Sequence, residues 1–164
     1  MNTETLNKGK RVDGAGFNTG RKYTRQGKVY ISMEFKYNKM PNARNYHYCD
    51  LVIPDSVTKS TSLYDYNSKV IYVFDILEYR VTGEKYFVYK SNENSAFCVP
   101  LSLLEQSYEK LSDVSVSELL NIFKEKRIRV GKQLNYNSSK FIIKGSIYDD
   151  YPIIFMKLKQ KTMS

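Results

Sequence analysis

The stretch KVIYVFDILEY, residues 69–79, is the longest apolar run in the chain and decides the predicted fold. It is rich in β-branched and aromatic residues, and apolar and polar positions do not alternate cleanly along it. Such a run is typical of a strand that is covered on both faces. The sequence therefore predicts a central strand here, a turn at residues 81–84 and a partner strand at residues 85–90.

The region upstream of this run predicts further strands. Residues 21–25 and 28–38 flank the dipeptide Gln26-Gly27, which is a pattern typical of a hairpin. A short strand follows and ends at Pro54, and the serine- and threonine-rich residues 55–63 are expected to form a loop.

Two helices are predicted downstream, over residues 101–111 and 116–128, after a short strand at residues 97–100. Each helix begins near a serine that is followed three residues later by a glutamate. In such a capping box the two side chains satisfy backbone N–H groups that the first helical turn leaves without partners. Ser102 and Ser115 are therefore the expected caps.

The fold class follows from the order of these elements. Strand patterns outnumber helices about three to one with no β-α-β alternation, which favours an α+β fold. We expect a single domain over residues 21–164, with a mostly antiparallel or mixed sheet of about six to eight strands. Residues 140–161 are expected to close it as a hairpin. Residues 1–20 are polar, contain four glycines and are expected to form a flexible basic arm.

Charge is the strongest functional signal in the sequence. The 164 residues include 26 Lys and Arg against 17 Asp and Glu, for a net charge of +9. The excess lies in residues 1–50 and 121–164, on either side of an acidic middle. If the two ends meet in space, they form a positive face that fits a polyanion. The alternative is that lysines, 19 of the 26, only solvate the surface.

These cations predict a small nucleic-acid-binding protein that contacts DNA or RNA phosphates. Lys124 and Arg127 also fit a second role, since cations in the last turn of a helix complement its dipole. Tyrosines interleaved with cations, at Tyr23, Tyr37 and Tyr46, are candidates for stacking on bases. The side chains expected to bind nucleic acid are Arg21, Lys22, Tyr23, Arg25, Lys39, Arg44, Lys124, Arg127 and Arg129.

Other classes of protein are disfavoured. No apolar run approaches the ~20 residues of a membrane span, and residues 1–11 lack a signal-peptide pattern, so we expect a cytoplasmic protein without membrane contact. Its Lys- and Asn-rich composition looks like that of phage and mobile-element proteins of low-GC bacteria. His47, Cys49 and Cys98 are too few for a typical zinc site, and no other cofactor is expected of a binding protein.

One pattern points to catalysis. Glu34 and Lys36 are two residues apart on a predicted strand, so their side chains project from one face, and Asp13 lies upstream. With the strand pattern up to residue 104, this resembles the PD-(D/E)XK restriction-endonuclease-like superfamily. The resemblance implies a Mg²⁺-dependent nuclease in which Asp13 and Glu34 bind the metal and Lys36 is the catalytic lysine. A solvent-facing Glu–Lys pair is the simpler alternative.

Three functions therefore remain open at the level of sequence. The first is a binding protein for nucleic acid, or for a protein that handles nucleic acid, without chemistry of its own. The second is the Mg²⁺-dependent nuclease. The third is a protein inhibitor of a host defence enzyme that targets nucleic acid.

Overall fold

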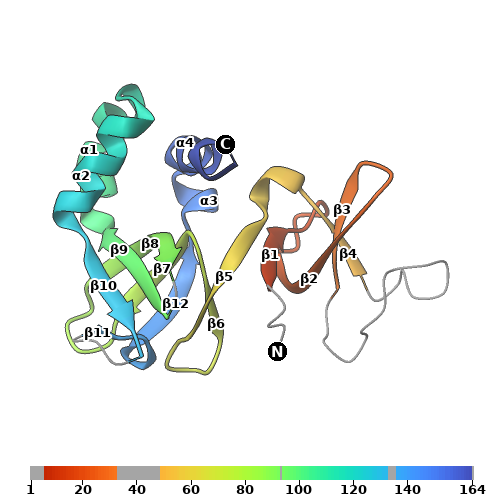
Figure 1. The fold of residues 1–164 in the computed structure, drawn as a ribbon, viewed down its shortest axis with the longest axis horizontal. Helices are drawn as coiled ribbons and strands as arrows, with labels where there is room; N and C mark the ends of the chain where they lie inside the picture. Colours follow the sequence, from red (N-terminus) through yellow and green to blue (C-terminus); the bar gives the residue numbers. More distant parts are fainter. Residues whose placement is uncertain (1–5, 33–48, 93, 133–135, 164) are drawn as a thin grey trace. The chain divides into compact units, whose positions relative to one another are not determined.

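A computed structural model of the chain describes residues 6–32, 49–92, 94–132 and 136–163 (Figure 1). It confirms the predicted α+β class: these residues form twelve strands, in two six-stranded sheets, and four α-helices. The chain divides into two compact units, Met1–Ser60 and Thr61–Ser164. The sequence had predicted one sheet of about six to eight strands rather than two sheets. No helix of the described residues is long and apolar enough to cross a membrane.

Unit 1 is built from short antiparallel strands in the order β4-β3-β2-β1-β5. The predicted hairpin is confirmed: Arg25 pairs with Lys28, and both Gln26 (φ 52°) and Gly27 (φ 76°) have the positive φ of a type I′ turn. The elements are β1 (Asn7–Lys10), β2 (Phe17–Arg25), β3 (Lys28–Ser32), β4 (Cys49–Val52), a 3₁₀ helix (Pro54–Ser56) and the start of β5 (Thr58–Tyr64).

Within unit 1, the chain at the end of β1 also contacts β4, in addition to the pairing of β1 with β2 and β5. Arg11 forms an antiparallel bridge with Val52, and the Ile53 N–H donates to the Lys10 carbonyl at 2.8 Å, so the end of β1 meets β4. Ile31, Val52 and Val57 are the buried core. β2 pairs first with β1 and then with β3, and the change occurs at Gly20. A Cβ at Gly20 would lie 1.8 Å from the Ser32 carbonyl oxygen, so this approach requires glycine.

The expected arm at residues 1–20 is therefore a strand region over Asn7–Lys10 and from Phe17 onward. This region is ordered despite its few apolar residues, because backbone pairing with neighbouring strands satisfies its N–H and C=O groups. The residues expected as a loop at 55–63 also form most of β5, in which Thr58, Thr61 and Leu63 are buried.

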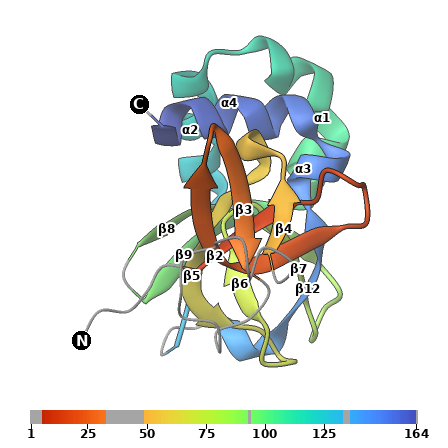
Figure 2. The same ribbon diagram turned by 90° about the vertical axis from the view of Figure 1, so that its right-hand side faces the viewer.

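Unit 2 is a mixed sheet in the order β11-β10-β9-β8-β7-β12, with its helices gathered over one face (Figures 1 and 2). Only the β10–β11 pair is parallel among the pairings of this sheet in the described residues. Its elements are β6 (Val70–Tyr72), β7 (Asp75–Tyr79), β8 (Lys85–Asn92), β9 (Ser95–Pro100), α1 (Leu101–Asp113), α2 (Val116–Lys126), β10 (Ile128–Gly131), β11 (Tyr136–Asn137), a 3₁₀ helix (Ser138–Lys140), β12 (Phe141–Ser146), α3 (Ile147–Asp150) and α4 (Pro152–Met163).

The stretch 69–79 is partly as predicted. β7 is covered on both faces, since Ile76 belongs to the core under the helices and Leu77 to the core on the opposite face. The run is not one strand, however, because a turn separates β6 from β7 at Phe74, whose φ is 75°. Two contacts stabilise this turn. The Asp75 carboxylate accepts the Tyr72 N–H at 2.8 Å, and the ring of Phe74 packs on that of Phe155 with their centroids 5.0 Å apart.

The C-terminal hairpin prediction is wrong, because residues 152–163 form helix α4. Pro152 occupies the first helical position, where its missing N–H has no cost. Ile154, Phe155 and Leu158 are buried with the i, i+1, i+4 spacing of a helix face.

The two predicted helices are confirmed as α1 and α2, with the predicted starts and with C-terminal ends that differ by two residues. Ser115 accepts the Glu118 N–H at 3.2 Å and caps α2 as expected. Ser102 does not cap α1, since that helix begins at Leu101 with Pro100 as its N-cap.

Candidate nucleic-acid interface

The β2–β3 hairpin of unit 1 carries the first group of predicted cations. Arg21, Lys22 and Arg25 lie on β2, and the chain has no acidic residue from position 14 to position 33. Lys22, Arg25 and Lys28 are exposed, and Arg21 is half-buried. Arg25 lies directly across from Lys28. Like charges in opposed positions destabilise a hairpin, so an anion that contacted both would stabilise it.

Two further lysines lie on β1, on the same face as Arg21. The Nζ atoms of Lys8 and Lys10 are each 4.9 Å from the centroid of the Phe17 ring. Lys10 is paired with Phe17, and strand alternation places Arg21 on the Phe17 side of β2. Lys8 is buried and Lys10 is half-buried, and sequence reasoning considered neither because it treated residues 1–20 as an arm.

Tyr23 is the one predicted stacking residue that the structure describes. It pairs across the hairpin with Tyr30 and is only 8% exposed. Its buried hydroxyl has no hydrogen-bond partner among the described residues. A base would reach this ring only if the ring were uncovered, so the structure supports a packing role for Tyr23.

The second group of predicted cations lies where α2 ends and β10 begins, in unit 2. Lys124, Arg127 and Arg129 are all exposed. The guanidinium carbons of Arg127 and Arg129 lie 4.6 and 5.9 Å from the centroid of the half-buried Phe97 ring. Lys90 pairs with Phe97 on its other side, so a lysine, a phenylalanine and an arginine form a row across β8, β9 and β10.

We call Lys90, Phe97, Arg127 and Arg129 the Phe97 patch. Residues opposite one another in neighbouring strands project to the same face, so the register places Lys90 and Arg129 on either side of Phe97 on one face of the sheet. Phe97 and Lys90 were not predicted, because strand register between segments so far from residue 129 leaves no signal in the sequence. The expectation that the two basic ends of the chain share one face involves both units and stays a prediction.

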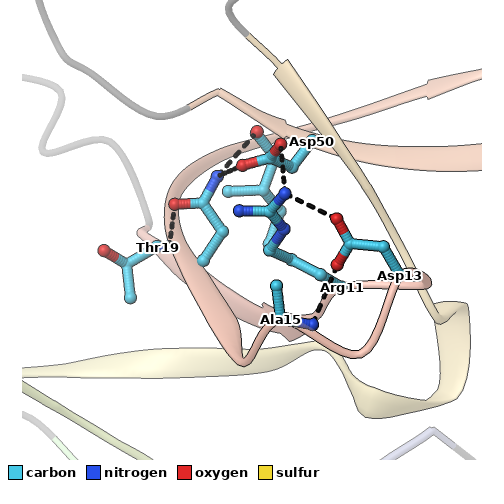
Figure 3. A network of polar contacts seen from close by, with 7 residues as sticks. Arg11, Asp13, Ala15, Thr19 and Asp50 are labelled. Carbon is cyan, nitrogen blue, oxygen red and sulfur yellow. Dashed lines mark hydrogen bonds and ion pairs between the residues drawn. The ribbon is translucent and has the colours of Figure 1, made fainter.

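Asp13, the first residue of the predicted nuclease site, lies in the turn between β1 and β2 (Figure 3). Its Oδ1 accepts the Ala15 N–H at 2.9 Å, and its Oδ2 is 2.6 Å from Nη2 of Arg11. The same Nη2 is 3.7 Å from Oδ1 of Asp50, whose Oδ2 accepts a hydrogen bond from Asn18 at 2.7 Å. The network therefore ties the turn to β2 and β4.

This arrangement favours a structural role for Asp13. The Ala15 N–H and the Arg11 guanidinium hold the pKa of the Asp13 carboxyl below its usual range. A Mg²⁺ ion at Asp13 would compete with the Arg11 guanidinium for the same carboxylate, and the metal-ligand role of Asp13 stays a prediction. No group of three or more His, Cys, Asp or Glu side chains within the described ranges is placed to hold a metal ion.

The other site predictions concern residues that the structure leaves undescribed. These are Glu34 and Lys36 of the predicted nuclease site, Lys39 and Arg44 of the predicted interface, and Tyr37, Tyr46 and His47. Cys98 is described and fully buried, and burial raises the pKa of its thiol, which favours a packing role.

Comparison of the sequence with protein-family models and with curated proteins finds no match. The function must therefore be argued from the residues and their geometry.

Proposed function

We propose that this protein binds nucleic acid, DNA or RNA, through contacts between its cations and backbone phosphates. The observation that carries the proposal is the Phe97 patch, in which the exposed Arg127 and Arg129 lie near one aromatic ring. The exposed Lys90 is paired with Phe97 from the neighbouring strand. Like charges held on one face repel each other, and a bound polyanion offsets this repulsion because it attracts each of the cations.

The chemistry of the patch suits phosphate in particular. Contact with the Phe97 ring restricts the two guanidinium groups, so less side-chain entropy is lost when they bind. A planar guanidinium donates two parallel hydrogen bonds to phosphate oxygens, which an ammonium group does not. The Phe97 patch therefore combines two arginines near the ring with a lysine on the neighbouring strand.

The β2–β3 hairpin supports the same function from the other unit. Arg21, Lys22, Arg25 and Lys28 lie within it, and the sequence from position 14 to position 33 contains no acidic residue. The opposed pair Arg25 and Lys28 flanks a rigid two-residue turn, which is a shape that enters a groove or follows a phosphate backbone.

Fluorescence anisotropy with labelled DNA and RNA at low salt tests the proposal. Arg127→Ala/Arg129→Ala should lower the affinity on the order of tenfold, since it removes two charge-assisted contacts. Lys85→Ala/Lys110→Ala removes the same charge from exposed positions outside the Phe97 patch and should change the affinity less than about twofold.

Two results would contradict the proposal. One is a wild-type protein that binds neither DNA nor RNA at low salt; the other is an equal loss of affinity in both double variants. Incubation of plasmid with Mg²⁺ in parallel separates a binding protein from a nuclease, and pull-down from nuclease-treated lysate tests the inhibitor alternative.

A further inference from the structure

Two tyrosines in unit 2 are exposed although tyrosine rings usually pack against other side chains. Tyr64, the last residue of β5, is 53% exposed, and Tyr66, in the turn that follows, is 51% exposed. The guanidinium carbon of Arg80 lies 3.5 Å from the centroid of the Tyr66 ring. At this distance the guanidinium plane covers one ring face, and the exposure of Tyr66 leaves ring surface open to solvent.

The turn that carries these tyrosines is held by the buried carboxylate of Asp65. Asp65, between the two tyrosines, is buried, and its Oδ1 accepts the Asn67 and Lys69 N–H groups at 2.9 Å each. Its Oδ2 accepts the Ile143 N–H of β12 at 3.1 Å. A rigid support lowers the entropy that a ligand loses when it binds to the rings.

Backbone hydrogen bonds bring residues with cationic side chains to the turn that holds the two tyrosines. The Tyr66 N–H donates to the Phe141 carbonyl at 2.8 Å, and the Arg80 N–H donates to the carbonyl of the preceding residue, Lys140, at 3.0 Å. These bonds bring Arg80 and Lys140 to the strand end beside the turn, and the Asp65 N–H donates to the Lys69 carbonyl across the turn. Arg80, Lys140 and Lys69 are all exposed.

We propose that Tyr64 and Tyr66 form a stacking platform for the unpaired bases of single-stranded nucleic acid, with Arg80, Lys140 and Lys69 placed for its phosphates. This inference rests on the proposed function and specifies its substrate. Open aromatic faces beside cations are the features with which proteins bind single strands without reading base edges. A duplex offers no free base faces except at its ends, so the platform favours single strands over duplex.

The test compares one labelled sequence of about 20 nucleotides, as single-stranded DNA, as single-stranded RNA and as DNA duplex. Tyr64→Ala/Tyr66→Ala should weaken single-strand binding at least tenfold and leave duplex binding within about twofold. Tyr64→Phe/Tyr66→Phe keeps both aromatic rings and should bind single strands as tightly as the wild type does. Both positions are exposed, so matching thermal unfolding midpoints will show that the variants remain folded.

The outcomes separate this inference from the proposed function. If the wild type binds nucleic acid but the alanine variant loses no single-strand affinity, or loses as much on duplex, the platform is wrong and the proposed function stands. If the phenylalanine variant loses as much as the alanine variant, stacking is wrong as the mechanism. If the wild type binds neither single strands nor duplex, both proposals fail.

Discussion

Replacing Asp65 tests whether one buried carboxylate holds the turn between β5 and β6. Asp65 is 3% exposed, and its two oxygens accept three backbone N–H groups, at 2.9, 2.9 and 3.1 Å. Asp65→Ala leaves all three donors without this acceptor. A buried donor without a partner costs roughly 1–3 kcal/mol, but water reaches the two donors in the turn. We therefore expect the free energy of unfolding to fall by about 2–4 kcal/mol.

Asp65→Asn is the matched control, because it keeps the shape and one acceptor oxygen. Its NH₂ group would face the donors on one side, so we expect a loss of about 1–2 kcal/mol. The chain has no tryptophan, so urea unfolding is followed by far-UV circular dichroism and tyrosine fluorescence. Alanine should also weaken single-strand binding more than asparagine does. An alanine variant as stable as the wild type, or an asparagine variant as unstable as alanine, would refute this role.

Three further predictions concern local structure. Ser115→Ala should destabilise the protein by about 1 kcal/mol because it removes the cap on the Glu118 N–H, whereas Ser102→Ala, without a cap bond, should leave the urea midpoint unchanged; equal effects would contradict this. Gly20→Ala should lower the free energy of unfolding by more than about 2 kcal/mol, because its Cβ would meet the Ser32 carbonyl. Gly14→Ala should lower it by only about 1 kcal/mol, because Gly14 has a φ of +78° but nothing lies within 4 Å of the added Cβ. The reverse order in the same urea series would contradict the close approach of Gly20 to Ser32. The pKa of the Asp13 carboxyl is lowered in the folded protein, so the contacts of Asp13 stabilise the fold above the ordinary carboxyl pKa, and this stabilisation is lost as the pH falls through the lowered pKa. The wild type should therefore unfold at a higher urea concentration than Asp13→Ala at neutral pH but not in acid. A difference in stability that does not change with pH would contradict this role of Asp13.

Local signals in the sequence predicted local structure well. Gln26-Gly27 specified its hairpin because both positions need positive φ, and Ser115 specified its helix start because the cap acts within four residues. α4 was missed for a physical reason: its residues have β propensity, and only burial of Ile154, Phe155 and Leu158 against the core selects the helix.

The candidate site was predicted less completely. Arg127 and Arg129 were found from their charge, but Phe97 and Lys90 join them only through the pairing of β8, β9 and β10. Tyr66 and Arg80 likewise meet because Asp65 ties its turn to β12. Neither association follows from local sequence, since both depend on backbone pairing between distant segments.

The salt dependence of nucleic-acid binding tests the central claim most directly. Each phosphate contact contributes about 0.9 to the slope of log Kobs against log salt on duplex DNA and about 0.7 on single strands. The wild type should show a steep negative slope, and Arg127→Ala/Arg129→Ala should reduce its magnitude by about 1.8 or about 1.4 respectively. A wild-type affinity that does not change with salt, or a slope that the double variant leaves intact, would contradict phosphate binding at the Phe97 patch.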